Sequence, residues 1–220
     1  MSHILNIETS TTNCSVSLSF ENDLVDCIEQ DSSNYSHSEN LHVFIKELLN
    51  KNNTEFNQLS AISVSRGPGS YTGLRIGLSA AKGLCYGLDI PLISISSLKI
   101  LANSIKYDGF IVSTMDARRD EVYSCIYDSN LNVIREEKPE IINHKSFIDI
   151  SKNNKLLFIG DGQFKCKELI NTNDNFSFES SILRPTSRNM IDLAFDKLKN
   201  SDFEDLAYFE PKYLKEFRTN

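Results

Sequence analysis

The chain of 220 residues carries a formal net charge of −7 and 40% hydrophobic residues, so it is long enough to bury a sizeable core in one or two domains. Its net negative charge disfavours contact with phosphate backbones, and its basic residues form no block longer than Arg118–Arg119 that could offset this repulsion locally. It has no long apolar run, no signal-peptide pattern and no CxxC pair among its five cysteines, so we expect a cytoplasmic protein with free thiols and no membrane contact.

The first half of the chain is predicted to form three strands, a helix, a strand and further helix and strand segments. In the clearest strand, residues 14–20, apolar side chains alternate with serines, which indicates one polar face. Ser36 and Glu39 fit a capping box at the start of the first helix. The predicted elements are three strands within residues 3–30, a helix over 36–51, a strand over 61–65, a glycine-rich helix over 72–88, a strand over 92–95 and a helix over 97–105.

The same order of elements begins again after residues 106–109, although the two halves share no detectable sequence identity. The second set comprises a hairpin over 110–115 and 121–127, a strand over 131–136, a helix over 146–150, a strand over 156–160 and a helix over 164–170. A duplicated βββαβα unit is the plan of the α/β fold shared by actin, sugar kinases and Hsp70 (the ASKHA, RNase H-like fold). We therefore expect two actin-like halves, residues 1–107 and 108–220.

The predicted helix over 72–88 follows a Gly-Pro-Gly turn and contains two stripes of small residues. Glycine costs about 1 kcal/mol relative to alanine at an interior helix position, so close packing must offset this cost. Gly73, Gly77 and Ala81 lie four apart, and one such stripe is expected to pack against the protein's own sheet. The apolar positions of the helix form a normal core face, which consists of Leu74, Leu78, Ala81, Cys85 and Leu88. The second stripe indicates a helix-to-helix contact with a partner. It consists of Ile76, Ala80, Gly83 and Gly87.

Five segments carry a family resemblance. The run SRGPGSYTGLRIGLSAAKGL is similar to the signature segment of the TsaB family (older name YeaZ), and ILNIETSTTNCSVSL resembles that family's first hairpin. The pieces SHSENL, MDARRDEVY and EPKYLK match it in order, so the resemblance covers most of the chain and is least distinctive over 130–200. TsaB proteins are partner subunits in making threonylcarbamoyladenosine in tRNA.

The resemblance implies a non-catalytic subunit that binds and supports TsaD, which transfers threonylcarbamoyl to the anticodon-adjacent adenosine of tRNAs reading ANN codons. TsaE, an ATPase, would join through the assembled complex. Two helices of about 25 Å would form half of a four-helix bundle with the partner. The expected partner-binding residues are His37, Leu41, Phe44, Ile45, Leu48, Ile76, Gly77, Ala80, Gly83 and Gly87. The sequence does not separate this heterodimer from a homodimer through the same helices.

In the duplicated fold a nucleotide lies between the halves, and the first hairpin of each half supplies a carboxylate and a tight glycine turn. The corresponding residues here are Glu8, Thr9 and Ser10, and Asp116, Arg118 and Arg119. Neither turn contains glycine, which argues against an amide cradle for phosphate and predicts a vestigial cleft without a cofactor. The two arginines are expected to pair with nearby carboxylates rather than to bind an anion.

No catalytic residue and no metal site is predicted. His37 and His42 are five residues apart, so on a regular helix they point about 140° away from each other. Ser70 is expected to cap the following helix rather than to act as a nucleophile. An ATPase or a glycoprotease-like hydrolase of the same superfamily stays an alternative function, although the glycine-free turns and the histidine spacing disfavour it.

Direct tRNA binding by this chain alone is not expected. No stretch interleaves aromatic with basic residues, as an RNA-reading sheet requires. The local cluster Lys212, Lys215 and Arg218 lies among acidic residues and forms a weak basic patch.

Overall fold

The computed structural model describes residues 2–32, 37–171 and 173–215, and the chain forms two compact units. The first unit joins the residues up to Ile100 to the later segment Pro185–Lys212, and the second joins Leu101–Arg184 to the residues from Tyr213 onward. The units therefore differ from the contiguous halves 1–107 and 108–220, because a segment near the end of the chain packs with the first unit.

The first unit is built on a mixed five-stranded sheet with the order β3-β2-β1-β4-β5. Its strands are β1 (His3–Glu8), β2 (Asn13–Phe20), β3 (Asp23–Asp31), β4 (Leu59–Ser65) and β5 (Leu92–Ile95). The first three strands form an antiparallel meander, and β4 and β5 run parallel to β1. The central strands β1, β2 and β4 are buried along nearly their whole length, so both faces of this sheet are covered.

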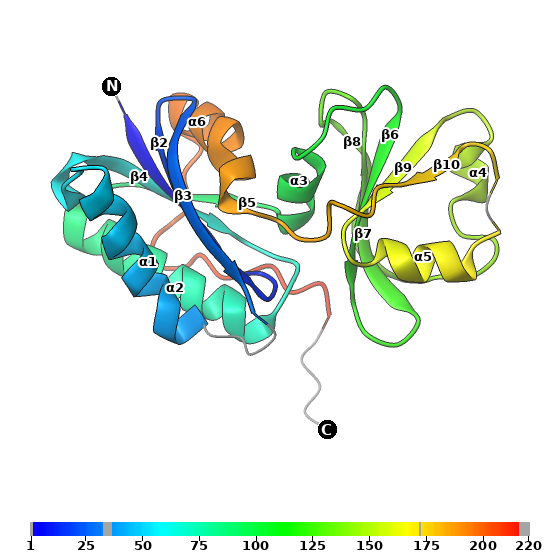
Figure 1. Ribbon diagram of the computed structural model, residues 1–220, viewed down its shortest axis with the longest axis horizontal. Coiled ribbons are helices and arrows are strands. Elements are labelled where there is room, and N and C mark those ends of the chain that lie inside the picture. The colour runs from blue at the N-terminus through cyan, green and yellow to red at the C-terminus, as the bar shows by residue number, and fades with distance from the viewer. Residues whose placement is uncertain (1, 33–36, 172, 216–220) are drawn as a thin grey trace. The chain divides into compact units, whose positions relative to one another are not determined.

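Helices cover the two faces of the first sheet (Figure 1). On one face lie α1 (His37–Lys51) and α2 (Tyr71–Leu88), with the short 3-10 helix η1 (Phe56–Gln58) between them in sequence. The other face is covered by the 3-10 helix η2 (Ser187–Met190) and by α6 (Ile191–Lys199), and α3 (Ser97–Ala102) follows β5. As expected, the Ser70 side chain caps α2, where its Oγ accepts a hydrogen bond from the Gly73 amide.

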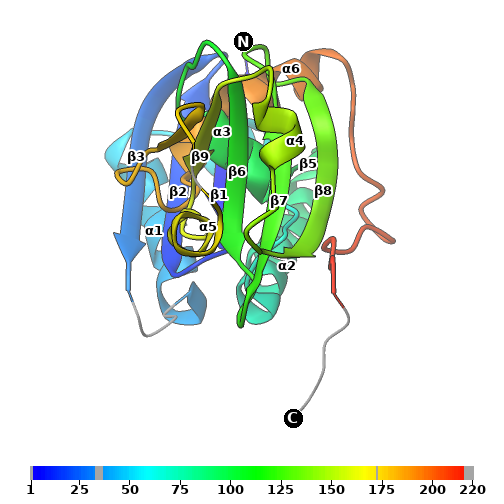
Figure 2. The ribbon, with the colours of Figure 1, turned by 90° about the vertical axis from the view of Figure 1, so that its right-hand side faces the viewer.

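The second unit repeats the plan with the strand order β10-β9-β6-β7-β8. Its strands are β6 (Phe110–Asp116), β7 (Glu121–Tyr127), β8 (Val133–Ile141), β9 (Leu156–Ile159) and β10 (Phe176–Phe178). Again the first three strands are antiparallel and the last two run parallel to the first of them. The helices α4 (Ile148–Ser151) and α5 (Gln163–Leu169) cover one face of this sheet (Figure 2). The predicted duplicated βββαβα fold is thus confirmed.

Several boundaries and elements differ from the sequence-based expectation. The helix expected over 97–105 ends at Ala102, and β8 continues to Ile141, because an edge strand tolerates the charged residues that follow 136. No element was expected over 176–178 or 187–199, where β10, η2 and α6 form. Ser36, the expected cap of the first helix, lies outside the described residues. None of the described helices is long and apolar enough to span a membrane.

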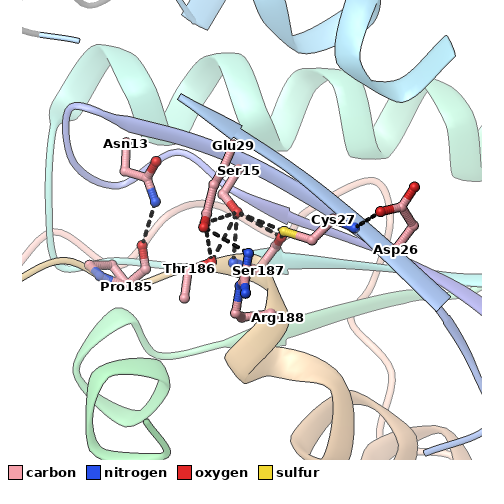
Figure 3. Close-up of polar contacts among 9 residues, drawn as sticks. All are labelled: Asn13, Ser15, Asp26, Cys27, Glu29, Pro185, Thr186, Ser187 and Arg188. Atoms are coloured by element: carbon pink, nitrogen blue, oxygen red, sulfur yellow. Dashed lines mark hydrogen bonds and ion pairs between the residues drawn. The ribbon is translucent and has the colours of Figure 1, made fainter. Parts of the chain in front are cut away.

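Polar side chains hold the returning segment to the first sheet (Figure 3). The Ser15 Oγ on β2 lies 2.8 Å from the Ser187 Oγ and accepts a hydrogen bond of 3.0 Å from the Ser187 amide. Glu29 on β3 accepts hydrogen bonds from Thr186 and from Arg188, the latter over 2.9 Å. The serine face of β2, which the alternation indicated as polar, is therefore buried beneath η2 rather than open to solvent.

Candidate functional site

An open groove runs along the surface of the first unit where α1 and α2 lie side by side. Its volume is about 690 Å³, and both helices contribute to its walls. The lining residues are Ser38 and His42 from α1, and Tyr71, Thr72, Arg75, Ile76, Ser79, Ala80, Gly83 and Leu84 from α2. The groove stays open over α2 because alanine and glycine occupy positions where larger side chains would fill the space.

The two small-residue stripes of α2 have different neighbours. A Cβ atom at Gly73 would overlap the carbonyl oxygen of Thr9, and one at Gly77 would overlap the Thr9 hydroxyl. At Gly83 and Gly87, by contrast, no heavy atom of a neighbouring segment lies within 4 Å of the position that a Cβ would take. The first stripe therefore packs against the protein's own first hairpin, and Gly77 is removed from the expected partner surface. The second stripe is open on the surface.

The expected partner contacts of three α1 residues are contradicted by the structure, because the side chains of these residues are buried. Leu41, Ile45 and Leu48 are 0%, 2% and 0% exposed and belong to the core between α1, α2 and the sheet. Phe44 is partly buried and packs against the same core. The apolar face of α1 thus serves its own unit, and a partner would not reach these three side chains without unfolding it.

His37 is a buried structural residue in this geometry. Its Nε2 lies 2.7 Å from the Thr11 carbonyl oxygen, which ties the start of α1 to the first hairpin turn. Burial lowers the pKa of His37, and the hydrogen bond to Thr11 only partly opposes this effect. Among the residues that the structure describes, no cluster of three or more histidine, cysteine, aspartate or glutamate side chains is arranged to hold a metal ion.

Four expected partner-binding residues lie near or on the open side of α2, namely Ile76, Ala80, Gly83 and Gly87. The first three of them line the groove. Sequence reasoning missed the polar end of the groove. There the guanidinium carbon of Arg75 lies 4.0 Å from the centroid of the Tyr71 ring, a cation–π contact. The signal was present, because these two residues are four apart on the helix and so share a face.

The first hairpin turn uses its own backbone amides internally. Thr9 donates its N–H to the Ser65 hydroxyl over 3.4 Å, and Ser10 donates its N–H to Glu8 Oε1 over 2.6 Å. Glu8 is fully buried, and burial raises its pKa to about 7, with hydrogen bonds from Ser10 and Ser65 opposing the shift. The Glu8 carboxyl group thus accepts the hydrogen bond of an amide that, in a phosphate cradle, would be free to bind the ligand.

The second hairpin turn repeats this arrangement within the second unit. Asp116 Oδ1 accepts the N–H of Arg118 over 2.6 Å and also lies 3.2 Å from the Lys165 ammonium nitrogen. The carboxylate of Glu121 pairs with Lys215. The expected ion pairs of Arg118 and Arg119 are therefore wrong: within the described part of the chain, neither guanidinium pairs with a carboxylate.

Two βββαβα units of matching strand order define a protein of the actin, sugar-kinase and Hsp70 fold class. The family model described as "TsaD: tRNA N6-adenosine threonylcarbamoyltransferase" matches residues 31–219. The chain belongs to the family that this model describes. Relatives that match at least 90% of this chain and at least 90% of their own length include TsaB proteins.

One such relative is "tRNA threonylcarbamoyladenosine biosynthesis protein TsaB" of Escherichia coli (strain K12), which is 28% identical over 96% of this chain and 94% of its own length. The solved structure of YeaZ from Pseudomonas aeruginosa superposes with a TM-score of 0.85 at 24% identity, covering 97% of this chain and 100% of that one. Another solved structure, the activator of 2-hydroxyisocaproyl-CoA dehydratase from Clostridium difficile, shares the fold with a TM-score of 0.50 at 12% identity. The match covers 91% of this chain and 96% of that one.

Proposed function

We propose that this chain acts in the biosynthesis of threonylcarbamoyladenosine in tRNA as a non-catalytic subunit that binds and supports TsaD. The names of its full-length relatives support the pathway. The observation that carries the subunit role is the groove between α1 and α2, whose floor at Gly83 is free of any neighbouring segment. Glycine in an exposed helix interior costs about 1 kcal/mol, and a partner packed against it would offset that cost.

The same geometry supports a role without catalysis of its own. The amides of Thr9, Ser10 and Asn13 are hydrogen-bonded to side chains of the first unit, and the amide of Arg118 to a carboxylate of the second. A phosphate group would have to displace these bonds, because it binds through free amide donors. We therefore expect no ATP hydrolysis by the isolated chain, and we expect its contribution to come through TsaD, with TsaE joining the assembled complex.

The groove suits a helix of the partner better than a flexible segment. It follows α2 over more than three helical turns, from Tyr71 to Leu84, and its lining combines small and apolar side chains with polar ones. An interface of ordinary size buries about 1,600 Å² in total, which two helices from each partner would supply. A homodimer would use the same groove and so would compete with TsaD for it.

The test compares two substitutions at one position. Gly83→Leu adds a side chain where the partner backbone would lie, whereas Gly83→Ala adds a single methyl group and improves helix propensity. We expect both variants to fold, and we expect Gly83→Leu alone to lower the affinity for purified TsaD by at least tenfold, measured by calorimetry or co-purification. Unchanged affinity of a folded Gly83→Leu variant would contradict the proposed groove.

A second measurement separates the subunit from the alternative functions. Steady phosphate release from ATP by the isolated chain, lost on Asp116→Ala, would favour an ATPase. Sedimentation of the chain alone and with TsaD would show whether the homodimer dissociates when TsaD binds. A homodimer that persists and excludes TsaD would favour a self-associating structural protein.

We expect no direct tRNA contact by the isolated chain. In the expected basic cluster, Lys215 is engaged by Glu121 and by the Ala117 carbonyl oxygen, and Arg218 lies outside the described residues. Modification of tRNA would then depend on this chain only through TsaD, in the cytoplasm. A gel-shift titration of the lone chain with tRNA, beside modification assays of TsaD with and without it, checks both statements.

A further inference from the structure

A row of polar side chains crosses the middle of the first sheet on the face beneath η2 and α6. Asn6 on β1 is paired in register with Ser17 on β2 and with Ser63 on β4, so the three side chains are neighbours on one face. All three residues are 0% exposed. The row is thus sealed from bulk water although it is made of hydrogen-bonding groups.

None of these side chains has its hydrogen bonds satisfied by the described part of the protein. The Nδ2 and Oδ1 atoms of Asn6 and the hydroxyls of Ser17 and Ser63 are buried without a hydrogen-bond partner. A buried polar atom left without a partner loses most of its solvation free energy, and four such atoms would consume a large part of the stability of a domain. Something besides the described part of the chain must therefore satisfy them.

The covering elements do not supply partners for this row. Met190 of η2 and Ala194 of α6 are buried against the same face, together with Ile4, Ala61 and Ile93 around the row. These side chains are apolar. One row away the situation differs, because Ser15 is hydrogen-bonded to Ser187 of η2. Along the serine face of β2, Ser17 is therefore the residue without a partner, since Ser19 also has one in the Ile4 carbonyl oxygen.

We propose that this row binds a small cluster of ordered water molecules enclosed between the sheet and the apolar cover of η2 and α6. The carboxamide of Asn6 selects this occupant, because it offers one donor group and one acceptor atom at the same place. A cation would satisfy only the acceptor, and an anion only the donors, whereas a water molecule both donates and accepts. Each buried water makes about three hydrogen bonds, so two or three molecules would satisfy the row.

The first test observes the occupant directly in the full chain. A crystal structure at a resolution that shows ordered water is expected to place water within hydrogen-bond distance of both Asn6 Nδ2 and Asn6 Oδ1. In solution, the Asn6 side-chain amide protons are expected to show cross-peaks to long-residing water. Direct hydrogen bonds from Asn6 to Ser17 or Ser63 without water, or a metal ion at this place, would overturn the proposal.

The second test uses stability and does not depend on a crystal. Ser17→Ala and Asn6→Leu remove partners of the bound water, so we expect each to lower the melting temperature. If the row were dry and unsatisfied, both substitutions would instead raise it, by several degrees for each polar atom removed. Ser19→Ala is the matched control, because this serine lies on the same strand and face and its hydroxyl already bonds the Ile4 carbonyl oxygen. The control loses a satisfied hydrogen bond and should lower the melting temperature slightly. A rise for both Ser17→Ala and Asn6→Leu beside such a fall for the control would overturn the proposal.

Discussion

The hydroxyl of Thr9 donates a hydrogen bond of 2.8 Å to the carbonyl oxygen of Gly73, and the same threonine fills the space beside Gly77. This contact joins the first hairpin turn to the first turns of α2. It explains why glycine occupies two positions one helical turn apart, since any side chain there would collide with Thr9. The hairpin turn is thereby fixed by the fold and not left free to close around a ligand.

Glycine positions in α2 should respond to alanine in opposite directions. Gly77→Ala introduces a methyl group against the Thr9 hydroxyl, so we expect a destabilisation of about 1–3 kcal/mol from overpacking. Gly83→Ala meets no neighbour and should stabilise the fold by about 1 kcal/mol through helix propensity. Urea denaturation of both variants beside the natural chain checks the signs, and equal shifts in the same direction would contradict the assignment of the two stripes.

Glu8 should make the stability of the fold depend on pH. Its pKa is raised from 4.5 to about 7 by burial, so the folded state favours the neutral carboxyl group. The stabilisation is fully present below about pH 4.5 and is lost as the pH rises toward 7, because the unfolded chain ionises first. The raised pKa corresponds to about 3 kcal/mol across this window.

The measurement is a comparison with Glu8→Gln, which keeps the shape of the side chain and cannot ionise. The difference in unfolding free energy between the two proteins should move in favour of the glutamine variant between pH 5 and pH 8. All other titrating groups are common to both proteins and cancel in this difference. A constant difference across the range would show that Glu8 does not carry the shifted pKa.

The second hairpin turn is expected to gain stability when its arginines are replaced. Arg118 and Arg119 have φ angles of +66° and +50°, in the left-handed region that disfavours most side chains. Asparagine and glycine adopt this region more readily, so the double variant Arg118→Asn, Arg119→Gly should stabilise the chain by about 1 kcal/mol. Arg118→Lys, Arg119→Lys retains both the charges and the strain and serves as the control. A loss of stability confined to the first variant would indicate contacts of the guanidinium groups that stabilise the turn.

The sequence predicted the fold well because its main signals are local. The alternation over residues 14–20 identified β2, and the glycine turn with Ser70 marked the start of α2. The neighbours of a surface cannot be predicted in this way. The alternation in β2 is that of a face exposed to solvent, whereas in the structure η2 and α6, which lie near the other end of the chain, pack over this face and bury it.

The candidate site shows the same limit at single residues. A spacing of four placed Gly73, Gly77 and Gly83 in stripes but did not tell which stripe met Thr9 and which met solvent. The apolar face of α1 likewise fits a partner contact by its periodicity alone, whereas the structure buries Leu41 and Ile45 within their own unit. Both outcomes depend on contacts between segments far apart in sequence, which periodicity does not encode.

Glu29 on β3 holds the returning segment, residues 186–188, against the first sheet (Figure 3). Its carboxylate accepts hydrogen bonds from Ser15, Thr186 and Arg188. Because the group is partly exposed, we expect Glu29→Ala to cost only about 1–2 kcal/mol in unfolding free energy. The more specific consequence is local: the Ser187 amide, which bonds the Ser15 hydroxyl over 3.0 Å, should lose protection against hydrogen exchange.

Asp26→Ala is the matched control on the same strand, because Asp26 bonds Lys51 and Asn52 instead. It should lower stability slightly and leave Ser187 protected. Equal protection of Ser187 in the two variants would mean that Ser15 and the apolar cover hold the segment without Glu29.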